Sequence, residues 1–415
     1  MKRPVQYVDH PKERHGDARL IQADETQIRR AAMTLFDNAP PPNSTPSAPG
    51  DDLIAAVRLA LVSGVGPRSW KALVARFGSP QAVLAAPPSH LRDVPGVGPK
   101  LSKKIAAAAE EIDAEAEIAD CRANGIEIVT RGHPSYPRSL AEISDPPSLL
   151  FVQGTIEPSD ALAIAIVGSR HATHYGLSQA ERLAGSLARA GLTIVSGLAR
   201  GIDAAAHRGA LAAGGRTIAV LGSGVLNIYP PENRELAFDV RKSGALVSEA
   251  PPRGEPLSGA FPQRNRIISG MSLGVIVVEA SSRSGALITA RHAGEQGRDV
   301  FAVPGRVDSR MSQGCHRLIR DGAKLVETAD DILDELGPLV AAASTREGQV
   351  VHHPAELLLN EPEQKVLAAV DTTPVSIDSV ISASQLPAPQ VLSTISVLEM
   401  RRLVRRVSGN LIVRP

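Results

Sequence analysis

A chain of 415 residues with 43% hydrophobic residues is long enough for two or three domains with sizeable cores. Charged residues make up 21% and the formal net charge is only +1, so bulk charge gives no reason to expect a nucleic-acid partner. Any such site must therefore be a local patch. Aromatic residues make up 3%, which limits the platforms on which bases could stack.

Cysteines and apolar runs exclude further classes of protein. Cys121 and Cys315 are the two cysteines and stand far apart, so neither a disulfide framework nor a C-x-x-C metal site is available. The start of the chain has no apolar signal core, and no apolar run reaches membrane length. We therefore expect a soluble, cytoplasmic protein with no metal, no cofactor and no membrane partner.

The first part of the chain is predicted to be a tail followed by helices. Residues 1–50 are polar and end in a proline-rich stretch, which is typical of a disordered tail. Residues 51–118 are predicted to be helical, since apolar residues recur at helical spacing over 53–61. The turns Gly64-Val65-Gly66-Pro67 and Gly96-Val97-Gly98-Pro99 echo one another between helix-like segments, and the second, within Leu91–Leu101, resembles a helix-hairpin-helix. Their bare N–H groups beside a helix start suit a DNA phosphate, although such turns also connect helices in protein-docking modules.

Short β-branched runs alternate with helical stretches over residues 119–336. This alternation is typical of βαβ units and predicts an α/β core, in which a parallel sheet is covered by helices on both faces. The expected strands are Ile126–Thr130, Ala163–Val167, Leu192–Ser196, Thr217–Leu221, Ala245–Ser248, Val275–Glu279, Val300–Val303 and Lys324–Glu327.

The last part of the chain is predicted to be a linker and a small domain. Residues 337–357 are small and polar, which indicates a linker. Residues 358–415 contain three helical segments and two strand-like runs around a Gly-Asn turn, the pattern of a winged helix. The third helical segment, about 388–401, has almost no basic residues before its end. Groove entry needs phosphate neutralisation, so protein contact is an alternative to DNA contact here.

Four loops that follow predicted strands are rich in glycine or serine and open a helix. Loop N–H groups at a helix start favour an anion, and arginine adds a bidentate phosphate donor. The first of these helices is expected to begin near Tyr175-Gly176. Because the carboxyl ends of parallel strands share one edge, the loops predict a phosphate-bearing ligand there. The loop residues expected at the site are Gly168, Ser169, Arg170, Gly197, Arg200, Gly201, Ser284, Gly285 and Thr289.

A further segment, Phe261–Ser272, places two arginines around an asparagine where a helix is expected to start. Arg264 and Arg266 can bind phosphate bidentately, and Asn265 can hydrogen-bond a base edge or the backbone. Phe261 is the candidate for stacking a base. The alternative is that both arginines pair with carboxylates inside the fold.

Six short motifs occur in one order through roughly residues 120–330, and together they resemble the DprA family, also called Smf. The flanking helical and winged-helix-like domains are similar to that family's architecture as well. The motifs are Gly168-Ser169-Arg170, Ser196-Gly197-Leu198-Ala199-Arg200-Gly201-Ile202-Asp203, Tyr229-Pro230, Phe261-Pro262-Gln263-Arg264-Asn265-Arg266-Ile267-Ile268-Ser269, Ser284-Gly285 with Leu287-Ile288-Thr289-Ala290, and Phe301-Ala302-Val303-Pro304-Gly305.

The resemblance implies an extended Rossmann fold that binds single-stranded DNA without catalysis. It also implies that the protein forms a homodimer, protects incoming DNA and helps to load RecA during natural transformation. The residues it carries over to the DNA pocket are Gly168, Ser169, Arg170, Arg264, Asn265 and Arg266. Two positions depart from the family pattern: Asn227 stands where Asp is frequent, and His316 stands where Asn is usual.

Two alternatives belong to other classes of protein. Related Rossmann proteins, resembling the cytokinin-activating LOG family, hydrolyse the glycosidic bond of nucleoside monophosphates and carry a Pro-Gly-Gly-x-Gly-Thr stretch followed by Glu. The corresponding loop here, Ser281–Thr289, has one glycine and no Glu at the right distance. Kinase or ATPase activity is disfavoured because no G-x-x-x-x-G-K-[ST] stretch exists. A protein-interaction scaffold is the remaining alternative.

Overall fold

The computed structural model describes most of the chain after the predicted tail. That tail, residues 1–50, lies outside the described part except for Gly50. No helix in the described part is long and apolar enough to cross a membrane. The described residues are 50–337, 343–345, 348, 350–407 and 410–414.

Short helices make up the N-terminal region. Proline occupies the first position of several of them, where its fixed φ suits a helix and its missing N–H removes no bond. Leu59, Leu73, Leu91 and Ile105 are fully buried and form the core of this region. The turn before α6 needs glycine at Gly96, whose φ is 86°. The helices are α2 (Asp51–Leu61), α3 (Pro67–Phe77), α4 (Pro80–Ala85), α5 (Pro88–Leu91), α6 (Pro99–Glu111) and α7 (Ala114–Ala123).

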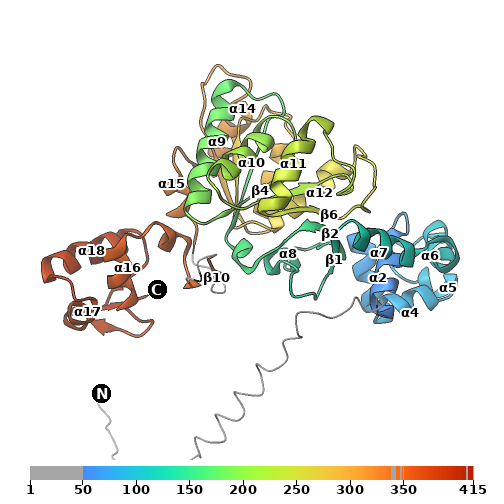
Figure 1. Ribbon diagram of the computed structural model, residues 1–415, viewed down its shortest axis with the longest axis horizontal. Helices are drawn as coiled ribbons and strands as arrows, with labels where there is room; N and C mark the ends of the chain where they lie inside the picture. The colour runs from blue at the N-terminus through green and yellow to red at the C-terminus, as the bar shows by residue number, and fades with distance from the viewer. Residues whose placement is uncertain (1–49, 338–342, 346–347, 349, 408–409, 415) are drawn as a thin grey trace, which may run out of the picture. The chain divides into compact units, whose positions relative to one another are not determined.

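A nine-stranded sheet forms the central layer, in the order β1-β2-β6-β5-β4-β3-β7-β8-β9 (Figure 1). Neighbours from β6 to β9 pair in parallel, which confirms the predicted α/β class with a Rossmann-like core. The chain builds outward from β3 to β6 and then returns to place β7 on the other side of β3. The strands are β1 (Ile126–Thr130), β2 (Leu149–Gly154), β3 (Ala163–Gly168), β4 (Thr193–Ser196), β5 (Thr217–Leu221), β6 (Ala245–Ser248), β7 (Gly274–Val278), β8 (Asp299–Ala302) and β9 (Lys324–Leu325).

One edge of the sheet differs from the prediction. β2 pairs antiparallel with β6, and β1 pairs antiparallel with β2, so the sheet is not wholly parallel. β2 is also missing from the strands that the sequence predicts. Its five residues from Leu149 to Gln153 are all buried. The predicted strands β4, β5 and β7 are equally buried, so lack of alternation does not set β2 apart. A short apolar run of this kind cannot be told from a buried helix segment by periodicity alone.

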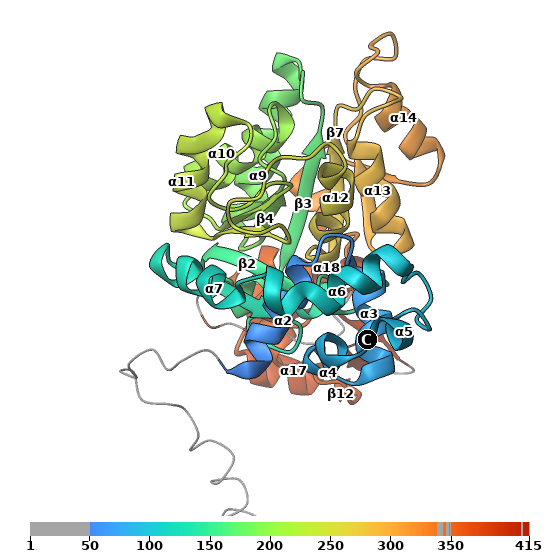
Figure 2. The ribbon, with the colours of Figure 1, turned by 90° about the vertical axis from the view of Figure 1, so that its right-hand side faces the viewer.

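Helices cover both faces of the sheet because successive strand residues point to opposite sides. On β3, Ile164 and Ile166 pack with α9 and α10, whereas Ala165 and Val167 pack with α12 and α13. Figure 2 shows the two groups on either side of β3. The helices of the core are α8 (Arg138–Ala141), α9 (His174–Arg189), α10 (Ile202–Ala212), α11 (Arg234–Ser243), α12 (Ala260–Gly270), α13 (Ala286–Glu295), α14 (Gln313–Arg320) and α15 (Ala329–Leu333).

Three helices and a small sheet form the C-terminal region, which confirms the predicted winged helix. The cap of α16 is the predicted one: the Asn360 side chain accepts the Glu363 N–H at 3.0 Å, and the Glu363 carboxylate accepts the Asn360 N–H at 2.9 Å. Val380, Val391 and Ile395 are fully buried between the helices. The elements are α16 (Glu361–Ala368), β12 (Val375–Ser376), α17 (Ile377–Ser384), α18 (Ala388–Met400), β13 (Arg405–Arg406) and β14 (Leu411–Val413).

The segment predicted as a linker, 337–357, carries structure where it is described. Two short strands, β10 (Ala343–Ser344) and β11 (Val350–Val351), pair antiparallel. A 3-10 turn, η3 (Pro354–Leu358), follows them, and Val351 is fully buried.

A buried ion pair joins the segment before β3 to the residue that precedes β5. The Arg216 guanidinium donates from Nε and Nη2 to the two carboxylate oxygens of Asp160, both at 2.8 Å. The two side chains are 4% and 5% exposed. The Thr193 hydroxyl also donates to Asp160, at 2.7 Å. An exposed pair has the same two-bond geometry: Arg253 donates to Asp120 at 3.0 Å in both bonds, and its side chain is 68% exposed.

These two pairs give a matched test of burial. Arg216→Met is expected to destabilise the core by about 3–5 kcal/mol, because it leaves the buried Asp160 carboxylate without its counter-charge. Arg253→Met should change the melting temperature little, since water replaces the lost contact. Thermal unfolding of both variants against the parent checks this. Equal losses for the two would show that burial does not decide the strength of the pair.

Candidate functional site

A pocket of about 660 Å³ lies at the carboxyl edge of the sheet, where the strand order reverses between β3 and β7. Open α/β sheets bind their ligands in this crevice. The loops after β3 and β7 and the helices α12 and α13 provide most of its wall, and we call it the switch-point pocket. The predicted residues that line it are Gly168, Ser169, Arg170, Phe261, Arg264, Asn265, Ser284, Gly285 and Thr289.

Arg264 forms part of the floor of the switch-point pocket. Its side chain is buried, its Nη1 donates to the Val220 carbonyl, and its Nε has no hydrogen-bond partner among the described residues. Burial lowers its pKa to about 10, with the nearby Arg170 charge adding to the effect and Asp203 opposing it. The guanidinium is therefore still charged at neutral pH, and no described carboxylate lies within ion-pair distance of it.

Gly197 and Gly201 do not line the pocket but allow its loops to close. A side chain at Gly197 would overlap the Arg264 guanidinium. Gly201 has a φ of 74° and lies against the Ser169 carbonyl, so it needs glycine for both reasons. The Ser169 hydroxyl accepts the His171 N–H at 3.1 Å and so holds its own turn.

Asp203 lines the pocket although it lies inside the start of α10. Its carboxylate accepts the Gly197 N–H at 3.1 Å and the Ala199 N–H at 3.4 Å, and so it fixes the loop before the helix. Burial raises its pKa, an effect that the Arg264 charge and these bonds oppose. Asp203 therefore stabilises a loop of the pocket, whose other charged lining residues are Arg170 and Arg264.

The start of α9 is not the open anion site that the sequence predicts. The Glu279 carboxylate, which follows β7, accepts the Thr173 N–H at 2.8 Å and the Thr173 hydroxyl proton. It lies so close to Gly176 that a side chain there would overlap it. A buried carboxylate therefore already satisfies this helix terminus and its dipole.

The start of α13 has no such acid. Its first turn contains no Asp or Glu, and Ser284, Gly285, Ala286 and Thr289 line the pocket. The Asn265 side chain donates to the Gly285 carbonyl at 3.3 Å, which links α12 to this turn. The positive end of the α13 dipole is thus available to an anion in the pocket.

Two of the predicted arginines lie outside the pocket. Arg200 is exposed and forms an ion pair with Glu232. Arg266 is buried and pairs with Glu249 at 2.6 Å and Asp145 at 3.6 Å. The segment holding Arg264 and Arg266 is not a helix start but the interior of α12. Residues two apart on a helix face different ways, so the carboxylate alternative describes Arg266 but not Arg264.

The two positions that depart from the family pattern have partners in their own surroundings. The Asn227 side chain donates to the Gly254 carbonyl at 3.3 Å. A ring nitrogen of His316 lies 3.0 Å from the Gly305 carbonyl. Both residues hold loops at the carboxyl side of the sheet, and neither lines the switch-point pocket.

Aromatic rings lie at one wall of the pocket. Arg170 is exposed, and its guanidinium carbon lies 5.5 Å from the centre of the Phe261 ring. The Tyr229 ring centre is 5.6 Å from that of Phe261, with the planes inclined by 49°. Tyr229 is absent from the predicted site. Tyr229 could have been predicted from its position in a glycine-rich loop after a strand, because the same feature identifies Gly168 and Ser284 as site residues.

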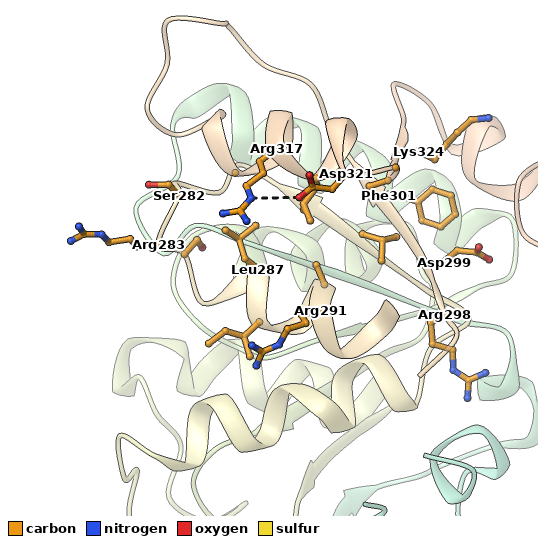
Figure 3. A pocket seen from close by; sticks show the side chains of 18 of the residues that line it. Ser282, Arg283, Leu287, Arg291, Arg298, Asp299, Phe301, Arg317, Asp321 and Lys324 are labelled. Carbon is orange, nitrogen blue, oxygen red and sulfur yellow. Dashed lines mark ion pairs between the residues drawn. The ribbon is translucent and has the colours of Figure 1, made fainter. Parts of the chain in front are cut away.

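A larger hollow, about 760 Å³, lies between α13 and α14 beside β8 and β9. Figure 3 shows Arg317 and Asp321, one turn apart at the end of α14, pointing toward one another, and their ion pair measures 3.5 Å. Lys324 pairs with Glu335 at 2.9 Å. Its floor is apolar, with Leu287 beneath the first pair. Four of its cations, Arg291, Arg298, Arg317 and Lys324, have carboxylate partners, whereas none is seen for Arg283 among the described residues. The pairing of most of its cations makes this hollow a weaker polyanion site than the switch-point pocket.

Comparison with known proteins adds an independent line of evidence. The family model described as DNA recombination-mediator protein A matches residues 127–337. A model described as the DprA winged helix domain matches residues 351–410, and one described as a SAM-like helix-hairpin-helix tandem matches residues 57–111.

Relatives and a solved structure agree with these models. The Smf protein of Synechocystis sp. is 34% identical over 378 residues, which cover 84% of this chain and 95% of that protein. The DNA processing protein DprA of Streptococcus pneumoniae is 48% identical over 200 residues, which cover 48% of this chain and 71% of that protein. The X-ray structure of DprA from Streptococcus pneumoniae matches with a TM-score of 0.59 and 36% identity, covering 68% of this chain and 97% of that one. The resemblance seen in the motifs is confirmed, and the chain belongs to the DNA recombination-mediator protein A family, the DprA or Smf proteins.

Proposed function

We propose that this chain binds single-stranded DNA in the switch-point pocket and acts as a recombination mediator without catalysis. The observation that carries the proposal is the set of positive groups that converge on one pocket and have no ion-paired carboxylate among the described residues. These are the buried Arg264 guanidinium, the exposed Arg170 guanidinium and the open N-terminus of α13. Family membership supports the same role, because the matching model describes recombination mediators and the relatives are named DNA processing proteins.

The pocket's chemistry favours phosphate as the group that is held. Arg170 and Arg264 supply charged donors, and the Ser284-Gly285 turn lies at the positive end of the α13 dipole. Asn265 lies between them and can bond either the backbone or a base edge. None of these groups distinguishes one base from another through a fixed pattern, so we expect little sequence specificity.

The size and place of the pocket favour a single strand. A hollow of about 660 Å³ can take a nucleotide whose base is unstacked. A duplex keeps its bases stacked and paired, so it offers the pocket no unstacked nucleotide. In this proposal the protein acts in the cytoplasm, forms a homodimer, protects incoming DNA and helps to load RecA during natural transformation. Support for these further roles comes from family membership alone.

The geometry gives less support to the nucleoside-monophosphate hydrolase. Glu279, the carboxylate nearest the relevant loop, is bound to Thr173 as a helix cap. His207 is buried with one ring nitrogen 2.7 Å from the Thr217 hydroxyl, and burial lowers its pKa to about 3. Neither group is placed to take a proton from a ligand in the pocket.

Binding preference is the first test. The full chain should bind a single-stranded oligonucleotide more tightly than a duplex of the same length, because the pocket admits an unstacked nucleotide. Fluorescence anisotropy with labelled oligonucleotides, repeated at several salt concentrations, measures both affinities. Equal or tighter binding of the duplex contradicts the proposal.

The arginines provide a second test with a matched control. Arg170→Ala should lower the log–log salt slope by about 0.7, the single-strand value for one phosphate contact. At low salt the loss should be about 1.5–3 kcal/mol, or roughly one to two decades in affinity. The melting temperature should stay unchanged because Arg170 is exposed.

Arg266→Ala should behave in the opposite way. It leaves the half-buried Glu249 without its partner, so the melting temperature should fall while the salt slope of the folded protein stays at the parent value. An unchanged slope for Arg170→Ala, or a reduced slope for Arg266→Ala, would remove the basis for the assignment of the pocket.

Absence of catalysis is the third test. ATP, NAD and nucleoside monophosphates should remain intact with the purified chain, as followed by chromatography of the products. Glu279→Gln should lower the melting temperature, since it weakens the cap of α9, and should not alter that result. Turnover that follows the protein through purification and disappears in Glu279→Gln would favour the hydrolase instead.

A further inference from the structure

The N-terminal region contains the same turn-and-helix unit twice. Each turn has a glycine at positive φ, 105° at Gly64 and 86° at Gly96. A backbone hydrogen bond closes each turn, at 2.9 Å before α3 and at 3.0 Å before α6. Each turn leads into a helix that begins with proline, Pro67 in α3 and Pro99 in α6. The two units are therefore equivalent in backbone as well as in sequence.

The two units lie against one another. Lys104 of α6 donates from Nζ to the carbonyl of Ser63 in the first turn, at 3.4 Å. A side chain at Gly64 would come within 3.3 Å of Cδ1 of Leu101, which is also in α6. The first turn thus packs against the start of the second helix, and both turns lie at the same end of the region.

Each unit places two cations at the same positions. Arg68 and Lys100 directly follow the two prolines, and Lys71 and Lys103 lie three residues later, about one helical turn on. All four side chains are exposed, and no described carboxylate forms an ion pair with any of them. Lys71 also donates to the Ser144 carbonyl at 3.5 Å, a contact that leaves its charge uncancelled. We call these four side chains the hairpin surface.

Acidic residues of this region lie mostly at the far ends of the helices. Asp51 and Asp52 begin α2, which ends at the first turn, and Glu110 and Glu111 end α6, which begins at the second. A rise of about 1.5 Å per residue puts these acids roughly 10 Å or more from the cations. That separation exceeds the screening length of about 8 Å at physiological salt. Asp93, just before the second turn, is the exception, so the hairpin surface keeps an excess of positive charge.

We infer that the hairpin surface binds the phosphate backbone of duplex DNA, as a second nucleic-acid site beyond the one in the proposed function. Two equivalent sets of cations fit a ligand that presents the same anion at regular spacing. The two strands of a duplex do so with about twice the charge per unit length of a single strand.

The hairpin surface offers an unstacked base no platform. Trp70 and Phe77, the aromatic residues of positions 50–118, both pack against the core of the region. Contacts here are therefore to phosphate alone, which a duplex supplies without unpairing its bases. Exposed charges bind an anion less tightly than a desolvated one. Duplex binding at this surface is thus expected to stay weaker than single-strand binding in the switch-point pocket.

The test uses the full chain with a labelled blunt duplex and a labelled oligothymidine of the same length, each titrated at several salt concentrations. The double variant Arg68→Ala/Lys100→Ala should lower the log–log salt slope for the duplex by about 1.8, since each lost phosphate contact contributes about 0.9. Duplex affinity should fall roughly tenfold or more at low salt. Arg68→Lys/Lys100→Arg keeps both charges and should retain the slope. Oligothymidine binding by the double alanine variant should stay at the parent values.

Two control variants separate this surface from the rest of the chain. Arg76→Ala removes an exposed cation of α3 outside the repeat, whose counterpart in the second unit is Ala108, and should leave the duplex slope at the parent value. Arg170→Ala should weaken oligothymidine binding and leave the duplex slope unchanged. All of these replaced side chains are exposed, so every variant should melt at the parent temperature.

The outcomes distinguish this inference from the proposed function. An absence of duplex binding by the parent, or an unchanged duplex slope in Arg68→Ala/Lys100→Ala, would overturn the inference. An equal loss of slope per charge in Arg76→Ala would do the same, because it would show diffuse attraction and not a site. Parallel losses for duplex and oligothymidine in the double variant would overturn the assignment to a duplex. Failure of the parent to bind oligothymidine would instead overturn the proposed function.

Discussion

A buried cation without a carboxylate of its own is the constraint around which the switch-point pocket is built. Taking Arg264 out of water is costly, and its lowered pKa reflects that cost. The Val220 carbonyl accepts one of its N–H groups, but Nε stays without a described partner. An anion in the pocket would supply the counter-charge that no described carboxylate provides by an ion pair with Arg264. In the proposed function, affinity for the anion comes in part from a charge that the protein has already desolvated.

The loops around Arg264 follow from the same constraint. Gly197 has no side chain because the guanidinium occupies that space. Asp203 binds the N–H of Gly197 and keeps the loop against the cation without forming an ion pair with it. Glu279 occupies the start of α9, whereas the first turn of α13 contains no Asp or Glu. The arrangement directs an anion toward one side of the pocket, where Arg170 and Tyr229 also lie.

Several parts of the site were predictable from local patterns. Gly168-Ser169-Arg170 and Ser284-Gly285 follow strands and open helices, and the shared edge of parallel strands brings them together. Arg266 was not predictable in this way. The pattern of two arginines around an asparagine is the same whether it begins a helix or lies inside one, but inside α12 the two arginines face different surroundings. Glu279 was likewise indistinguishable from a free strand-end acid until Thr173, more than a hundred residues away in the chain, was seen to bind it.

The fold class, the family and the edge of the sheet at which we place the site follow from the sequence alone. These depend on short-range properties: strand and helix periodicity, glycines in turns, and the order of the motifs along the chain. Only the tertiary structure decided which charges are free. It pairs Arg266 with Glu249 and Asp145, caps α9 with Glu279, covers Phe261 with Arg170 and leaves Arg264 and Tyr229 facing the pocket. A side chain's availability depends on what the rest of the chain places against it, and that is a property of packing between distant segments, which no local pattern carries.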